Sequence, residues 1–81
     1  MSPIGYNSVR TRLAEMGLTS RQRDIALRVL AGLSNRRIAS ELGLTEQTVK
    51  DHIHTIFRKL GIHHRAELAA RVLPLSLEEG R

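Results

Sequence analysis

A three-residue connection, "GLT" at residues 43–45, is the feature that most constrains how this chain can fold. Before it, a short stretch of helical apolar spacing follows Ser34 and ends at Leu42. After it, apolar residues recur every three or four positions as far as Leu60. The glycine provides a left-handed exit from one helix, and the threonine can cap the next. Two helices joined by so short a turn are typical of a helix-turn-helix unit.

The other apolar patterns also predict helices, and no segment alternates in the way a strand does. Thr19 is followed three residues later by Gln22, which predicts a capping box at the start of a helix that ends near Ala31. A last helix is expected over residues 65–73, because Pro74 cannot continue it. Helices are therefore the only regular elements predicted.

The chain is long enough for one small domain. It has 81 residues, of which 41% are hydrophobic and only 2% aromatic, so the core must be aliphatic. We predict an all-α fold, a small four-helix helix-turn-helix domain over residues 18–73. Residues 1–17 are an N-terminal extension that is either a further helix, from the spacing within 8–16, or a linker. Residues 74–81 are expected to be a C-terminal tail.

The helix predicted from about residue 46 to residue 60 is amphipathic. Its apolar side carries Val49, Ile53, Ile56, Phe57 and Leu60. Its polar side carries Gln47, Lys50, Asp51, His54 and Arg58. We expect the first side to be buried in the core and the second to be exposed to a partner.

Composition and spacing give no support for a metal site or a cofactor. The chain has no cysteine, which excludes disulfides and thiolate ligands. His52 and His54 are two residues apart and point in different directions on a helix, while His63 and His64 are adjacent. Neither pair has the spacing of a helical metal site, so we predict no metal and no cofactor.

Several broad classes of function are also disfavoured. No run approaches the roughly 20 apolar residues that span a bilayer, and the N-terminus lacks the apolar segment of a signal peptide, so a cytoplasmic location is predicted. There is no nucleophile motif, phosphate-binding glycine loop or carboxylate pair, which predicts a non-enzyme. The net charge of +5 favours an anionic partner such as nucleic acid, with a solvated basic surface as the alternative.

Three stretches of the sequence, "LTSRQRDI", "GLSNRRIASELGLTEQTVKDHI" and "FRKLGIHHRAELA", carry a family resemblance through their order and spacing. From Leu18 to Val72 the chain resembles the DNA-binding domain of LuxR-type (LuxR/GerE, NarL/FixJ) bacterial transcriptional regulators. The resemblance implies a third helix in the DNA major groove and a fourth that makes dimer contacts. Such a domain is often the output module of a response regulator, so the chain is either a stand-alone regulator or a fragment of a longer one.

The resemblance also implies roles for individual residues. Base contacts are expected from Val49, Lys50, Asp51 and His54, with Val49 otherwise a core residue. Phosphate contacts are expected from Asn35, Arg36, Thr48 and Lys59 by resemblance, from Thr45 at a helix N-terminus and from Arg58 by its charge. The implied dimer interface consists of Ala66, Ala69, Ala70 and Leu73.

Two positions depart from the family pattern. Gln22 stands where the family usually has a glutamate, which keeps the capping box but loses the carboxylate. Asp51 places a carboxylate on the groove face, where it either accepts from cytosine N4 or pairs with a nearby basic residue of the protein itself.

The sequence thus predicts sequence-specific binding of double-stranded DNA for transcription regulation, by a homodimer at the nucleoid in the cytoplasm. RNA polymerase is a further candidate partner, and no small molecule or membrane is expected to bind this chain. Two alternatives remain open. One is a sigma-factor-like promoter-binding domain, which shares the "LT..Q" start and the "TVK" helix. The other is a helical protein–protein adaptor with a basic face.

Overall fold

The computed structural model describes the backbone of residues 6–73 and the side chains of residues 8–73. Within this range the chain forms helices and no strand. The helices are α1 (Tyr6–Glu15), α2 (Ser20–Leu30), α3 (Asn35–Leu42), α4 (Glu46–Leu60) and α5 (Arg65–Val72). The all-α prediction is confirmed, and the uncertain segment before residue 18 is helical. The predicted tail, residues 74–81, lies outside the described residues.

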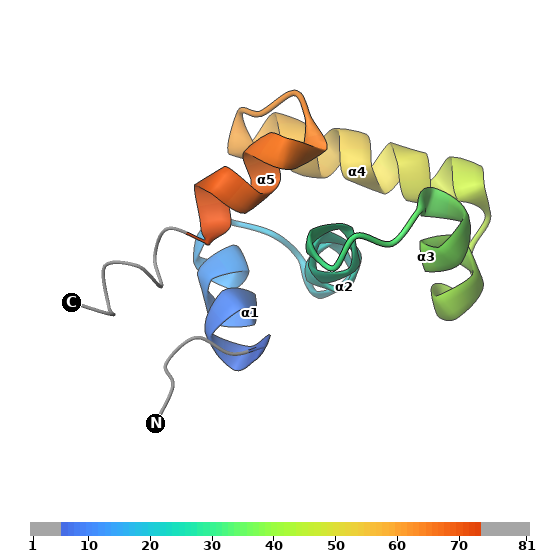
Figure 1. The fold of residues 1–81 in the computed structure, drawn as a ribbon, viewed down its shortest axis with the longest axis horizontal. Helices are drawn as coiled ribbons and strands as arrows, with labels where there is room; N and C mark the ends of the chain where they lie inside the picture. The colour runs from blue at the N-terminus through green and yellow to red at the C-terminus, as the bar shows by residue number, and fades with distance from the viewer. Residues whose placement is uncertain (1–5, 74–81) are drawn as a thin grey trace.

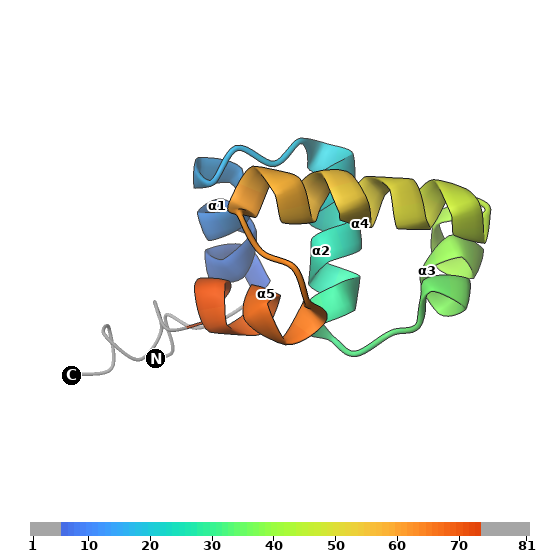
Figure 2. The same cartoon turned by 90° about the horizontal axis from the view of Figure 1, so that it is seen from above.

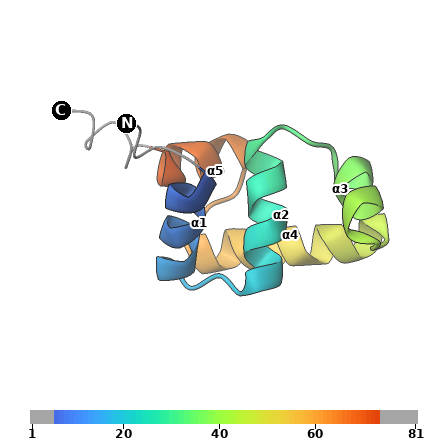
Figure 3. The ribbon, with the colours of Figure 1, turned by 90° about the horizontal axis from the view of Figure 1, so that it is seen from below.

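The helices surround α2, which is seen end-on in the middle of Figure 1. α4 crosses over α2, and α1 lies beside α2 (Figure 2). α3 packs against the N-terminal half of α4, at the far end of the molecule from α1 (Figure 3). α5 packs against α1 and α2. In the described part of the chain, no helix combines the length and the apolar character needed to cross a membrane.

The helix boundaries follow from local capping chemistry, as predicted. The hydroxyls of Thr19, Ser34 and Thr45 each accept a hydrogen bond from a backbone N–H three residues later. At the exit of α3, Gly43 has φ +69°, a conformation that strains residues with a side chain. The turn between α3 and α4 therefore depends on the glycine and the threonine that made it recognisable in the sequence.

The core is aliphatic and draws on all five helices. Its buried members are Leu13, Leu18, Ile25, Ala26, Val29, Ile38, Ala39, Val49, Ile53, Ile56, Leu60, Ile62, Leu68 and Val72. Phe57, predicted to belong to it, is only half-buried and packs at its edge. One side of the ring faces an open hollow that is also lined by Gly61 and Ile62, so the loop after α4 does not cover it.

The helix α1 is part of this domain and not a separate linker. Leu13 is 0% exposed and lies in the shared core. Arg10 forms a salt bridge with Asp24 of α2 (3.0 Å) and donates to the Ser20 hydroxyl. Burial of one leucine contributes about 1.5–3 kcal/mol, which exceeds what a half-exposed ion pair adds. Apolar packing by Leu13, with Val9 and Met16 at the edge of the core, therefore contributes more to the attachment of α1 than the ion pair does.

A hydrogen-bonded bridge joins the end of α4 to the loop between α1 and α2. The Lys59 ammonium donates to the Gly17 carbonyl (3.0 Å) and to Gln22 Oε1 (2.9 Å). The same Gln22 oxygen also accepts from the Thr19 N–H (2.9 Å), which completes the capping box of α2. Gln22 is buried, so its oxygen needs these donors. The amide thus takes over the role that a glutamate would have at this position.

Two glutamates fix the outer helices. Arg28 of α2 and Arg37 of α3 both donate to Glu41, and these hydrogen bonds hold the pKa of the Glu41 carboxyl below its ordinary value. At the start of α5, Glu67 accepts from the backbone N–H groups of His63 and His64, which lowers the pKa of Glu67 in the same way. Without these two carboxylates, the N–H groups that donate to them would have only water as an acceptor.

We predict that Lys59→Met lowers the free energy of unfolding by about 1 kcal/mol, because it removes charge-assisted hydrogen bonds that are partly shielded from water. Arg58→Met is the matched control, since Arg58 is the adjacent exposed cation and has no such partners among the described residues. It should change the free energy by less than about 0.5 kcal/mol. Urea unfolding followed by far-ultraviolet circular dichroism measures both. Equal losses in the two variants would contradict the bridge.

We also predict that Glu67 stabilises the domain in a pH-dependent way. Its pKa in the folded state lies below the ordinary value of 4.5, so its contribution is complete above that pH and is lost as the pH falls through the folded-state pKa. Glu67→Gln should be less stable than the parent at neutral pH and equally stable at pH values below the folded-state pKa. Urea unfolding between pH 7 and pH 3 tests this, with Glu15→Gln as control. A constant difference across that range would refute it.

Candidate nucleic-acid interface

The outward face of α4 is the most distinctive surface of the molecule. α4 packs against α2 and α3 through its buried side, and this packing fixes its rotation about its own axis. The opposite side presents Gln47, Lys50, Asp51, His54 and Arg58, all of them exposed. The predicted division of this helix into a buried and an exposed face is therefore present.

The N-terminus of α4 offers hydrogen-bond donors beside that face. Thr45 accepts from the Thr48 N–H (3.1 Å), and its own hydroxyl donates to Thr48 Oγ1 (2.9 Å). The Thr48 hydroxyl hydrogen is then left to bind an outside acceptor. The amides of the first turn and the positive end of the helix dipole favour an anion at the same place. Glu46, exposed in this turn, is the one carboxylate there.

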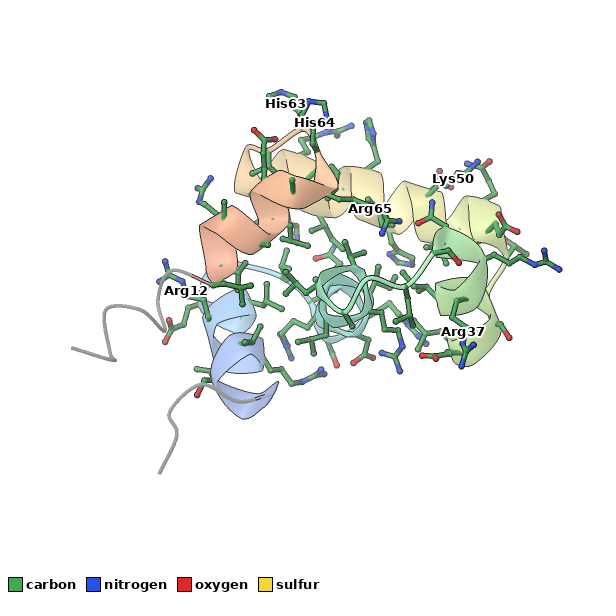
Figure 4. All side chains as sticks on the ribbon, in the orientation of Figure 1. Arg12, Arg37, Lys50, His63, His64 and Arg65 are labelled. Atoms are coloured by element: carbon green, nitrogen blue, oxygen red, sulfur yellow. The ribbon has the colours of Figure 1, made fainter. Side chains whose placement is uncertain are left out.

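Three cationic or titratable side chains of the face remain available to a partner. Lys50 points away from α2 on the outer side of α4 (Figure 4). Lys50, His54 and Arg58 make no hydrogen bond or salt bridge with any other residue that the structure describes. His54 and Arg58 also border the open hollow beside Phe57. Their donors can therefore be used without breaking an internal contact.

Gln47 and Asp51 are joined on this face. Gln47 Nε2 donates to Asp51 Oδ1 at 3.0 Å, across one helical turn. The expected partners of Asp51 were a cytosine or a nearby basic residue, whereas the structure gives it the neutral amide of Gln47. Gln47 itself was not predicted to take part in recognition. Its spacing of four residues from Asp51 is a signal that the sequence already carries.

The residues around the start of α3 are less available than predicted. Asn35 Oδ1 accepts a hydrogen bond from Arg65 of α5, which also donates to the Leu33 carbonyl (3.1 Å). Arg36 is exposed and has no partner among the described side chains. Arg37 points away from the side of the molecule that carries Lys50 (Figure 4). Only Arg36 thus offers its whole side chain here, and Asn35 offers its amide nitrogen.

Of two further predicted contact residues, Val49 is buried and Lys59 is exposed but bonded within the domain. Val49 is 0% exposed, so its side chain has no surface to present to a thymine methyl group. The Lys59 ammonium lies against the α1–α2 loop and donates there. We therefore correct the assignment of Val49, which is a core residue. Lys59 has two acceptors within the domain, and its phosphate contact stays a prediction. The burial of Val49 was expected from its place on the apolar side, whereas the partners of Lys59 lie far away in the sequence.

The residues predicted to form a dimer interface lie on the outside of α5. Ala66 and Ala70 are exposed, Ala69 is half-buried, and Leu73 is 41% exposed. The helix is attached to its own domain by Leu68 and Val72 instead. Packing within one chain thus leaves Ala66 and Ala70 exposed and covers Ala69 in part.

A metal centre finds no support in the side chains that the structure places. No three His, Cys, Asp or Glu residues among them gather closely enough to hold an ion. The rings of His63 and His64 lie 6.5 Å apart, centroid to centroid, in the loop before α5.

Comparison with known proteins bears directly on this arrangement. The family described as "Bacterial regulatory proteins, luxR family" matches residues 16–72. No solved structure matches the chain.

Curated relatives agree with this family assignment. The two-component response regulator PprB of Pseudomonas aeruginosa is 40% identical over 63 residues, which cover 78% of this chain and 23% of PprB. The nitrate/nitrite response regulator protein NarP of Escherichia coli is 46% identical over 56 residues, covering 69% of this chain and 25% of NarP. The transcriptional regulatory protein UhpA of the same species is 40% identical over 55 residues, covering 68% and 28%.

The chain therefore spans about a quarter of the length of these relatives. The family is one of DNA-binding transcription regulators and not of enzymes. The matched stretch includes all of α2, α3, α4 and the described part of α5. Residues 16–72 form a helix-turn-helix domain, and the chain belongs to the luxR family of bacterial regulatory proteins.

Proposed function

We propose that this domain binds double-stranded DNA at specific sequences and regulates transcription, with α4 in the major groove and two copies of the chain on each site. The observation that carries the proposal is the outward face of α4, which is fixed in orientation by its buried side and exposed along its polar side. An α-helix fits the major groove, which is about 12 Å wide. We place this activity in the cytoplasm, at the nucleoid.

Base contacts are assigned to the exposed residues in the first two turns of α4. Lys50 can donate to guanine O6 or N7, and His54 lies about one turn further along the same face. Asp51 lies beside them, but because its Oδ1 is bonded to Gln47 it is proposed to act through that residue and not on a base. Each good base contact is worth about 1–3 kcal/mol of discrimination.

Phosphate contacts are assigned to the rim of that face. Thr45 and Thr48 lie at the N-terminus of α4, where backbone amides and a hydroxyl hydrogen can bind a phosphate. Arg36 and Arg58 contribute charge on either side of the groove face, and Asn35 contributes its amide nitrogen. Such contacts set the register of the protein on the duplex and carry no sequence information.

The second copy of the chain is proposed to meet the first through α5. Ala66, Ala69, Ala70 and Leu73 share one side of the helix, and small residues there allow two helices to approach closely. A two-fold dimer would present two copies of α4 to two inverted half-sites. The sigma-factor-like and adaptor alternatives gain no observation of their own. Contact with RNA polymerase stays a prediction.

The proposal predicts that selection from a randomised duplex pool yields a motif with two inverted half-sites. Anisotropy titrations across a salt series should show that the winner binds roughly a thousandfold tighter than a scrambled duplex. Equal affinity and equal salt dependence for both duplexes would mean that the basic surface acts only as an electrostatic patch. A single half-site in the motif would exclude the dimer.

We further predict that Lys50→Ala weakens binding to the selected site more than binding to the scrambled duplex, because Lys50 is assigned to a base. Arg58→Ala is the contrasting variant. As a phosphate contact, Arg58 should lower both affinities alike when removed and reduce the salt slope by about one. Anisotropy titrations on both duplexes separate the two patterns. Parallel losses for Lys50→Ala would reassign Lys50 to the phosphate backbone.

A further inference from the structure

We propose that Gln47 and Asp51 act as one unit that selects adenine in the major groove. In this unit Gln47 contacts the base, and Asp51 is a positioning residue that fixes the orientation of the Gln47 amide. The inference rests on the proposed function and deepens it, since it names a base and the two residues that choose it.

The geometry that carries the inference is the hydrogen bond from Gln47 Nε2 to Asp51 Oδ1, 3.0 Å long. Both side chains are exposed, and they lie one turn apart in the N-terminal half of α4, on either side of Lys50 in the sequence. The N-terminal part of a recognition helix is the part that reaches base edges most directly. The pair therefore lies where a base contact is expected.

The chemistry of the two groups determines which way the amide faces. A side-chain amide has a nitrogen that donates and an oxygen that accepts. If the neighbouring group can both donate and accept, either the nitrogen or the oxygen of the amide can face it. An ionised carboxylate only accepts. Asp51 therefore requires the nitrogen of Gln47 on its side and turns Gln47 Oε1 toward the groove.

One N–H of Gln47 remains after this bond, and no residue that the structure describes donates to the amide oxygen. Adenine needs this combination of one donor and one acceptor, because its N7 accepts and its N6 amino group donates. Guanine offers two acceptors, O6 and N7, and would face the amide oxygen with one of them. Thymine O4 is likewise an acceptor. A glutamine that was free to turn would tolerate these bases, whereas Gln47 held by Asp51 favours adenine.

The same argument explains a carboxylate on a surface that meets phosphates. An exposed Asp51 lowers affinity through repulsion that solvent and salt weaken. The benefit of Asp51 is discrimination between bases, because a neutral side chain that both donates and accepts would not force one orientation of the Gln47 amide. Asparagine at position 51 has both a donor and an acceptor, so it could bind either end of Gln47. Asp51→Asn therefore tests the orientation with almost no change in shape.

The experiment is selection from a randomised duplex pool with the unaltered chain, Gln47→Ala, Asp51→Asn and Asp51→Glu. We expect the unaltered chain to require adenine at one position of each half-site. Gln47→Ala should lose that preference, and Asp51→Asn should accept guanine or thymine there, with the rest of the motif unchanged. Asp51→Glu keeps an acceptor-only group one turn away and should retain adenine. Thr11→Ala, an exposed change in α1, is the control and should leave the motif intact.

Anisotropy titrations give the size of the effect. Replacing the selected A·T pair by G·C should weaken binding of the unaltered chain by about 5- to 150-fold, and binding of Gln47→Ala much less. In a duplex with 7-deazaadenine at this position, the N7 acceptor is missing. The unaltered chain should then lose several-fold in affinity, and Gln47→Ala should lose none. The double variant Gln47→Ala with Asp51→Asn should match Gln47→Ala, since Asp51 acts through Gln47.

The outcomes separate this inference from the function on which it rests. If selection yields no motif with any chain, the proposed function fails and the inference fails with it. If a motif appears and Gln47→Ala leaves every position unchanged, the inference alone is wrong. If Asp51→Asn instead abolishes a preference for cytosine, Asp51 contacts a base directly and is not a positioning residue. Circular dichroism melts of each variant verify that the domain is folded.

Discussion

Burial of one side of α4 is the constraint on which the rest of this domain depends. A helix of 15 residues is only marginally stable alone in water, so α4 owes its stability to packing against α2 and α3. Val49, Ile53 and Ile56 fix the rotation of the helix, since turning it by one residue would move its polar side about 100°. The buried residues of α4 therefore determine which of its other residues face outward.

Local rules were enough to predict α2, α3, α4 and α5, whereas they left α1 open as a helix or a linker. Capping by Thr19, Ser34 and Thr45 involves residues three positions apart, and the glycine exits depend on single residues. The two faces of α4 also follow from spacing alone. The fold class and the division of α4 into a buried and an exposed face could therefore be read from periodicity without any knowledge of tertiary contacts.

Side-chain partners distant in sequence could not be predicted in this way. Lys59 donates to Gly17 and Gln22, which lie 42 and 37 positions before it in the sequence. Arg65 donates to Asn35, which lies 30 positions before it. Nothing in the spacing of a lysine or an arginine distinguishes one that meets a phosphate from one that meets a carbonyl across the fold. Gln47 and Asp51 are only four residues apart, so their spacing allows the contact, but spacing alone does not determine that the two side chains bond.

The folding unit is larger than the part of the chain that defines the family. The luxR family matches residues 16–72, yet Leu13 of α1 is fully buried in the same core as Leu68 and Val72 of α5. α1 also contacts α2 directly, and its Arg10 is paired with Asp24. Removing α1 would therefore expose part of the core that supports α5.

The balance of charge on the outer face bears on how such a domain would distinguish sites. Lys59 is bonded within the protein, and Glu46 and Asp51 place carboxylates beside the remaining cations. Phosphate contacts are sequence-independent, so each cation withdrawn from them lowers specific and non-specific affinity together. Base contacts change only the affinity for the specific sequence. In the proposed DNA complex, an outer face of α4 with few free cations and an amide oriented by a carboxylate would lower total affinity but keep the difference in affinity between one sequence and another.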